Sequence, residues 1–115
     1  MTNQSCIFCG IRDGQIPGEK LYEDDSAFVI RDINAVAPTH LLVIPRKHIS
    51  VVSDLGPEDA ALMGHLTVIA NDMAESAGIA QSGYRLVVNN GPDSGMGVSH
   101  LHMHVLGGGP MGPVA

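Results

Sequence analysis

Three histidines alternate with apolar residues near the C-terminal end of the chain, and this pattern limits the possible folds more than any other. The alternating residues are His100, Leu101, His102, Met103, His104 and Val105. Side chains alternate across a β-strand, so the imidazoles should share one face and the apolar residues the other. The pattern predicts a strand over residues 99–106, with its apolar face on a core and its histidine face open to chemistry.

A glycine-rich loop precedes this strand. It contains Gly91, Gly95 and Gly97, together with Pro92, Asp93 and Ser94. Glycine lets the main chain come close to a ligand, and successive main-chain N–H groups form a concave site that favours an anion. The loop therefore predicts a phosphate-type ligand beside the histidines.

Three interpretations of the histidines compete on the pattern alone. They are a solvated strand, a metal chelate on one zinc ion, or a phosphoryl- or nucleotidyl-transfer site with one imidazole as nucleophile. A glycine loop that runs directly into the strand favours the third interpretation.

The segment from His100 to Leu106 resembles the histidine-triad signature, in which three histidines alternate with apolar residues. Further similar segments are Asp32-Ile33, Ala37-Pro38-Thr39-His40, Val43-Ile44-Pro45-Arg46-Lys47-His48-Ile49, Tyr84-Arg85, Val87-Val88-Asn89 and Gly107-Gly108. Together they resemble the Hint-like branch, the nucleoside phosphoramidate hydrolases, from about Cys6 to Pro113. The resemblance implies a homodimer that binds a nucleoside monophosphate.

Composition narrows the possible partners. A chain of 115 residues is expected to form one domain, 1–115. The net charge is −6, only Arg46-Lys47 is an adjacent basic pair, and aromatic residues are scarce, so no nucleic-acid partner is expected. There is no apolar run of 18 residues and no secretory signal pattern, so we expect a cytoplasmic protein without membrane contact.

The pair Cys6 and Cys9 has three interpretations: half of a zinc site, a redox pair, or chance. The resemblance favours zinc, because some members of the superfamily bind it through positions that correspond here to Cys6, Cys9, His48 and His100. A site with four protein ligands is closed, so this zinc would be structural.

The remaining chain predicts an α+β fold. Strands are expected over residues 20–23, 27–31, 40–44 and 84–89, in addition to 99–106. One long helix should begin at Pro57 and end at Gly78, with its apolar stripe on the sheet or at a dimer interface; the stripe is Leu62, Leu66, Ile69 and Met73. The sheet should have about five antiparallel strands, with residues 84–89 and 99–106 forming a hairpin.

Site residues follow from the resemblance. Asp32, which by itself would be an ordinary turn residue, is implied to bind the ribose hydroxyls. The apolar slot for the base would include Ile33, with Phe8 and Leu42 as weaker candidates. His40, otherwise a structural histidine at a strand edge, becomes a proton relay.

The chemistry is expected to centre on His102. As a neutral imidazole it would attack phosphorus and form a nucleotidyl-histidine intermediate that water cleaves. His104 would donate a hydrogen bond to the phosphate. The main-chain N–H groups of the loop would do the same, and the loop residues concerned are Gly95, Met96 and Gly97. Asn89 would bind the sugar or the leaving group, and no catalytic metal is needed.

Three positions depart from the family pattern. Met96 stands where a glutamine is usual, and Gly97 where a hydroxyl residue is frequent; Gly109 replaces a common arginine. We therefore expect a slow or narrow hydrolase of purine nucleoside 5′-phosphoramidates or related derivatives. One alternative is a low-activity nucleotide-binding regulator. Another is a metal-dependent hydrolase with the three triad histidines on one metal, which would leave Cys6 and Cys9 without a partner.

Overall fold

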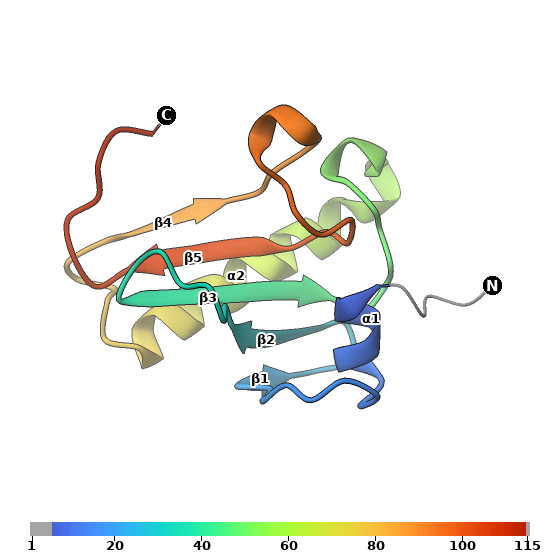
Figure 1. Cartoon of the computed structure of the whole chain (residues 1–115), viewed down its shortest axis with the longest axis horizontal. Coiled ribbons are helices and arrows are strands. Elements are labelled where there is room, and N and C mark those ends of the chain that lie inside the picture. The colour runs from blue at the N-terminus through green and yellow to red at the C-terminus, as the bar shows by residue number, and fades with distance from the viewer. Residues whose placement is uncertain (1–5, 115) are drawn as a thin grey trace.

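A computed structural model describes residues 6–114, so the first five residues and Ala115 of the expected domain lie outside the described part. Its centre is an antiparallel sheet with the strand order β1-β2-β3-β5-β4 (Figure 1). The strands are β1 (Tyr22–Glu23), β2 (Ala27–Arg31), β3 (Thr39–Pro45), β4 (Tyr84–Val87) and β5 (Met103–Gly107). With one long helix against the sheet, the predicted α+β fold is confirmed.

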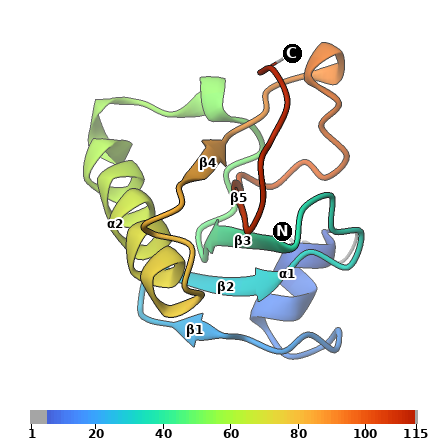
Figure 2. The same ribbon diagram turned by 90° about the vertical axis from the view of Figure 1, so that its left-hand side faces the viewer.

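The long helix α2 (Ala60–Ser76) covers one face of the sheet (Figure 2). A single 3₁₀ turn, Pro57–Asp59, leads into it. Within the predicted apolar stripe, Leu66 and Ile69 are buried, and Leu62 and Met73 are partly buried against the same core. The helix ends before Gly78, whose φ of +76° is a left-handed conformation that glycine adopts without strain. Of the two positions expected for the stripe, the sheet and a dimer interface, the structure shows the first.

A short helix, α1 (Ile7–Arg12), covers the opposite face, and the sequence did not predict it. The Cys6 sulfur accepts a hydrogen bond from the Cys9 N–H at 3.3 Å and so caps the helix. Phe8 and Ile11 pack on a second apolar cluster, which also contains Phe28, Ile30, Leu42 and Ile44. The helix therefore depends on tertiary packing, since six residues are too few for a stable isolated helix.

The histidine strand is shorter than predicted. It begins at Met103, not at residue 99, and Met103 pairs with Val43 of β3. In this register Leu101 would face Pro45, which has no N–H to donate to the ladder. The Leu101 N–H instead donates to the Ile49 carbonyl at 2.6 Å. The strand predictions at 20–23 and 84–89 were also too long, by two residues each.

Although the strand begins later than predicted, the side chains of residues 100–105 still alternate between two faces. Leu101, Met103 and Val105 are buried in the core under α2. The expectation of an open histidine face was wrong for two residues, because His100 is completely buried and His102 is 9% exposed. The cause is α1, whose Phe8 ring packs edge-on against both imidazoles.

Within residues 6–114, neither helix has the length and apolar character that a membrane span requires.

Candidate active site

The histidine face leads into a cavity of about 440 Å³ between α1, the sheet and the glycine loop. Most of the predicted binding residues line it: Phe8, Asp32, Ile33, Leu42, Asn89, Gly95, Gly97, His102 and His104. Met96 does not line this cavity, and His40 lines an adjoining one that shares Asp32, Asn89 and His104. Four apolar residues of the wall were not predicted from the sequence: Ile7, Ile11, Ile30 and Val98. The spacing of Ile7 and Ile11 on one helical face was the signal available for two of them.

The His102 ring is held by a main-chain carbonyl. Its Nδ1 lies 2.7 Å from the His100 oxygen. A carbonyl only accepts hydrogen bonds, so Nδ1 carries the hydrogen and Nε2 keeps its lone pair. The Phe8 ring packs edge-on at 5.1 Å between centroids and limits rotation of the imidazole. In the neutral imidazole this arrangement therefore places the free basic nitrogen, Nε2, at the cavity.

His104 is held differently. Its Nδ1 lies 2.9 Å from the Nε2 of His40. Burial, and then the nearby His102 and His40, lower the pKa of His104 to about 4, against a smaller opposite effect of Asp32. Its Nε2 is buried and has no hydrogen-bond partner among residues 6–114. Buried polar atoms are nearly always paired, so this nitrogen indicates a position for a ligand atom.

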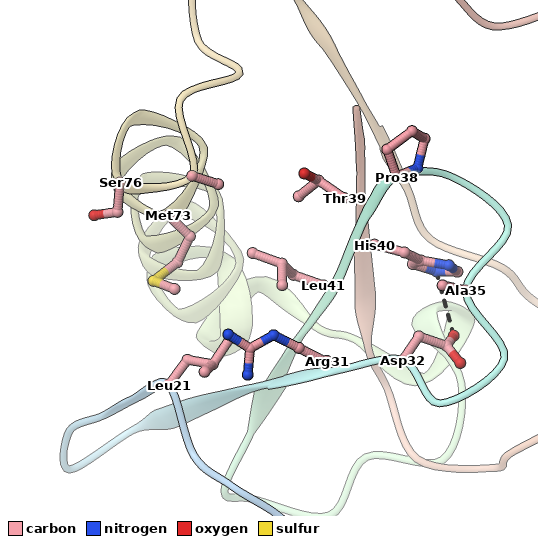
Figure 3. Close-up of a pocket in the computed structure, with 11 residues that line it drawn as sticks. Leu21, Arg31, Asp32, Ala35, Pro38, Thr39, His40, Leu41, Met73 and Ser76 are labelled. Atoms are coloured by element: carbon pink, nitrogen blue, oxygen red, sulfur yellow. Dashed lines mark ion pairs between the residues drawn. The ribbon is translucent and has the colours of Figure 1, made fainter. Parts of the chain in front are cut away.

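The Asp32 carboxylate serves both the turn and the cavity. One oxygen accepts the Asn34 N–H at 2.8 Å, which is the ordinary role of a turn aspartate. The other lies 3.3 Å from His40 Nε2 (Figure 3). Beside it, the Ile33 side chain is 90% exposed and projects at the mouth of the cavity.

The glycine loop presents main chain to the cavity. Gly91 and Gly95 have φ values of +84° and +80°, a region that side chains rarely occupy, and a 3₁₀ turn (Pro92–Ser94) lies between them. Gly97 has an ordinary φ, and a Cβ atom built there would meet nothing within 4 Å. The loop therefore offers N–H donors and has room for the side chain that Gly97 lacks.

Cys6, Cys9, His48 and His100 form a cluster on the other side of Phe8. His100 Nδ1 lies 3.3 Å from Cys6 Sγ, 3.5 Å from Cys9 Sγ and 3.1 Å from His48 Nδ1, and Cys9 Sγ lies 3.2 Å from His48 Nδ1. Donors around a tetrahedral zinc with bonds of about 2.0–2.3 Å lie roughly 3.3–3.8 Å apart, so the cluster has nearly the right size.

The tautomer of His100 fits the same interpretation. Its Nε2 lies 2.8 Å from the Pro45 carbonyl and therefore carries the hydrogen, which leaves Nδ1 free to ligate. Two thiol sulfurs and two imidazole nitrogens are a common donor set for structural zinc. In the described part of the chain, no cluster of potential ligands joins the three triad histidines, so the single-metal alternative lacks the geometry it needs.

A second cavity, of about 370 Å³, lies between α2 and the ends of β2 and β3 (Figure 3). Arg31, Thr39, Met73 and Ser76 line it, and of the predicted site residues only Asp32 and His40 reach it. It lacks the histidine pair and the glycine loop of the first cavity.

Known proteins resemble this chain over almost its whole length. The family model described as HIT domain matches residues 13–111. The chain belongs to the HIT domain family. This HIT protein is 41% identical over 111 residues to the purine nucleoside phosphoramidase of Escherichia coli (strain K12), covering 96% of this chain and 93% of that protein. The resemblance inferred from the sequence is confirmed.

Solved structures of other HIT proteins share the fold. A histidine triad protein from Clostridium difficile superposes with a TM-score of 0.94 at 39% identity, over 100% of both chains. A zinc-bound histidine triad family protein from Mycobacterium smegmatis superposes with a TM-score of 0.79 at 30% identity, covering 92% of this chain and 76% of that one.

Proposed function

We propose that this HIT protein hydrolyses purine nucleoside 5′-phosphoramidates, or related nucleoside phosphate derivatives, through a nucleotidyl intermediate on His102. One observation carries the proposal: the 2.7 Å contact of His102 Nδ1 with the His100 carbonyl leaves Nε2 as a free nucleophile at the cavity. The name of the Escherichia coli relative supplies the substrate class.

The substrate would lie along the cavity with its base between apolar side chains. Phe8, Ile33 and Leu42 line that region. The Asp32 carboxylate accepts hydrogen bonds only, which suits the two ribose hydroxyls. Asn89 would bind the sugar or the leaving group. The Gly97 main-chain N–H would bind the phosphate, which a chain of net charge −6 would otherwise repel, while the Gly95 N–H already donates to the Pro92 carbonyl at 3.1 Å and holds the turn.

The reaction divides into two displacements. His102 Nε2 attacks phosphorus, the phosphorus–nitrogen bond to the leaving amine breaks, and the amine takes a proton from a water in the cavity. The expected route through His40 is not used, because its two ring nitrogens are bonded to the Val36 N–H and to His104. Water then attacks the nucleotidyl-histidine, releases the nucleoside monophosphate and restores the neutral ring. His104 donates a hydrogen bond to a non-bridging phosphate oxygen in both steps. Preorganised donors of this kind commonly contribute several kcal/mol.

Zinc would be held by Cys6, Cys9, His48 and His100, and it would supply a structural cross-link and no chemistry. This link ties α1 to His48, beyond the end of β3, and to His100, two residues before the nucleophile. Since Phe8 lies between Cys6 and Cys9 in the chain and packs on His102, the cluster helps to fix the catalytic ring.

Two further features belong to the proposal. We infer a homodimer from the family resemblance and from β4, which forms one edge of the sheet and is half-buried along its length. We also infer a single domain over residues 1–115 and a cytoplasmic location.

The proposal is tested by assaying adenosine 5′-phosphoramidate with the wild type and His102→Ala. Loss of a covalent nucleophile should reduce kcat by at least about 10³-fold. His65→Ala is the matched control, because His65 lies on α2 and hydrogen-bonds Asp24 away from the cavity. Equal rates for wild type and His102→Ala would refute the proposal. The absence of side-chain donors at Met96 and Gly97 favours one alternative, a regulator that binds the nucleotide without turnover.

A further inference from the structure

The loop between β2 and β3 places one main-chain N–H against His40, the hydrogen-bond partner of His104. The Val36 N–H donates to His40 Nδ1 at 3.1 Å. The Val36 side chain is 77% exposed, so the residue contacts the site through its main chain. His40 itself is buried, with only 6% of its surface exposed, and its ring has little freedom to turn away.

This contact determines where the hydrogens lie on two rings. His40 Nδ1 accepts from Val36, so the hydrogen of neutral His40 is on Nε2. That N–H donates to His104 Nδ1 at 2.9 Å, with an Asp32 oxygen at 3.3 Å as a second acceptor. His104 Nδ1 therefore accepts, and the hydrogen of His104 is on Nε2, the buried atom without a partner in the described chain.

We propose that Val36 is a positioning residue whose main-chain N–H fixes the tautomer of His40 and, through it, presents the His104 Nε2–H as a fixed donor to the substrate phosphate. The inference rests on the proposed function, in which His104 donates to a non-bridging oxygen. With the opposite His40 tautomer, two donors would face each other at Val36 and His104 Nε2 would lose its hydrogen. The Nε2 atoms of His102 and His104 would then both present lone pairs to the anionic phosphate.

The same hydrogen-bond chain argues against a second metal site. Asp32, His40 and His104 place donor atoms close together. Neutral His40 would need a free Nε2 to bind a metal, and its hydrogen would then face the Val36 N–H. The chain of donors and acceptors is satisfied only without the ion.

The test replaces the Val36 main-chain N–H by an oxygen, which cannot donate a hydrogen bond. Val36 is replaced by its α-hydroxy acid counterpart, which converts the amide to an ester and keeps the side chain. Val36→Ala is the control, since it keeps the N–H and changes only an exposed side chain. Long-range ¹H–¹⁵N spectra of imidazole-labelled protein at pH 7 report the tautomers of His40 and His104, and steady-state assays report kcat and KM.

We expect both histidines to carry hydrogen on Nε2 in the wild type and in Val36→Ala. The ester should show mixed tautomers at both rings and a kcat lower by about tenfold, with KM within about twofold. Wild-type His40 with its hydrogen on Nδ1 would overturn the inference, even if the ester variant failed to fold. Unchanged tautomers in a folded ester would also overturn it. The spectra report the tautomers whether or not the protein turns over substrate. A failure of this inference can therefore be told from a failure of the proposed activity, which only the assays report.

Discussion

The imidazole centroids of His102 and His104 lie 5.0 Å apart, yet the Nδ1 atom of His102 faces the carbonyl oxygen of His100 while that of His104 faces His40. Two neighbouring rings thus have different hydrogen-bond partners. One presents a lone pair and the other an N–H to the same cavity. This difference separates a nucleophile from a donor within one short segment.

His104 should remain neutral far below the ordinary histidine pKa. Burial is the main cause of its pKa of about 4, because the charged form loses hydration. Its folded pKa is below the unfolded value of about 6.5, so the unfolded state binds the proton first. His104 therefore contributes stability above pH 6.5 that is lost as the pH falls toward 4. An NMR titration of the ring should show no protonation between pH 8 and 5, and a midpoint near 6.5 would contradict the account.

Restoring a donor in the phosphate loop should speed the reaction. Gly97→Ser adds a hydroxyl where a Cβ meets nothing within 4 Å and where φ is ordinary. A donor aimed at transition-state charge is worth up to about 10²-fold, so we expect kcat/KM to rise by roughly tenfold or more. Gly97→Ala is the matched control, because it adds the carbon without the hydroxyl. A serine variant no faster than the alanine variant would contradict this assignment of the loop.

Zinc bound by Cys6, Cys9, His48 and His100 should stabilise the folded protein. Metal analysis of the purified protein should find one zinc ion per chain, and Cys9→Ser or a strong chelator should lower Tm by about 10–20 °C. His65→Asn should keep the metal, since His65 pairs with Asp24 outside the cluster. Protein that neither contains zinc nor binds added zinc would contradict the assignment.

Asp24 should make stability depend on pH below about 4. Burial acts to raise the pKa of its carboxyl, but hydrogen bonds from Tyr22, Ser26, His65 and Ala27 together hold it well below its usual range. A lowered folded pKa adds stability above the unfolded value of about 3.9, and this is lost as the pH falls further. Asp24→Asn should cost about 1–2 kcal/mol at pH 7 and less at pH 3. The neighbouring exposed Asp25→Asn is the control, and equal losses for both variants would refute the role of Asp24.

The sequence predicted the alternation of the histidine segment and the apolar stripe of the long helix, but it did not predict what covers the other face of the sheet. Alternation at His100–Val105 and the stripe at Leu66 and Ile69 follow simple periods, and both were confirmed in the fold. The helix α1 was missed because it has six residues and a cysteine as its N-cap, and neither is a usual helix signal. Because Phe8 of α1 covers His100 and His102, missing this helix also meant missing the burial of the two rings.

For His102 the chemistry of a neutral nucleophile predicts a carbonyl or similar acceptor at one ring nitrogen, and the His100 carbonyl is that acceptor. The tautomers of His40 and His100 were beyond prediction, because they depend on main-chain partners at Val36 and Pro45, and a main-chain N–H or carbonyl is the same for any residue type. Sequence patterns show which side chains are present and at what spacing. They do not show which carbonyl a ring nitrogen will face, since tertiary packing decides that.

Detection of the covalent intermediate tests the central claim most directly. The protein is mixed with excess adenosine 5′-phosphoramidate, quenched within milliseconds in alkaline denaturant because such linkages are labile in acid, and analysed by intact and peptide mass spectrometry. The account predicts one adenylyl group per chain, located on His102 and absent from His102→Ala. Turnover without an adduct, or an adenylyl group on another residue, would contradict it.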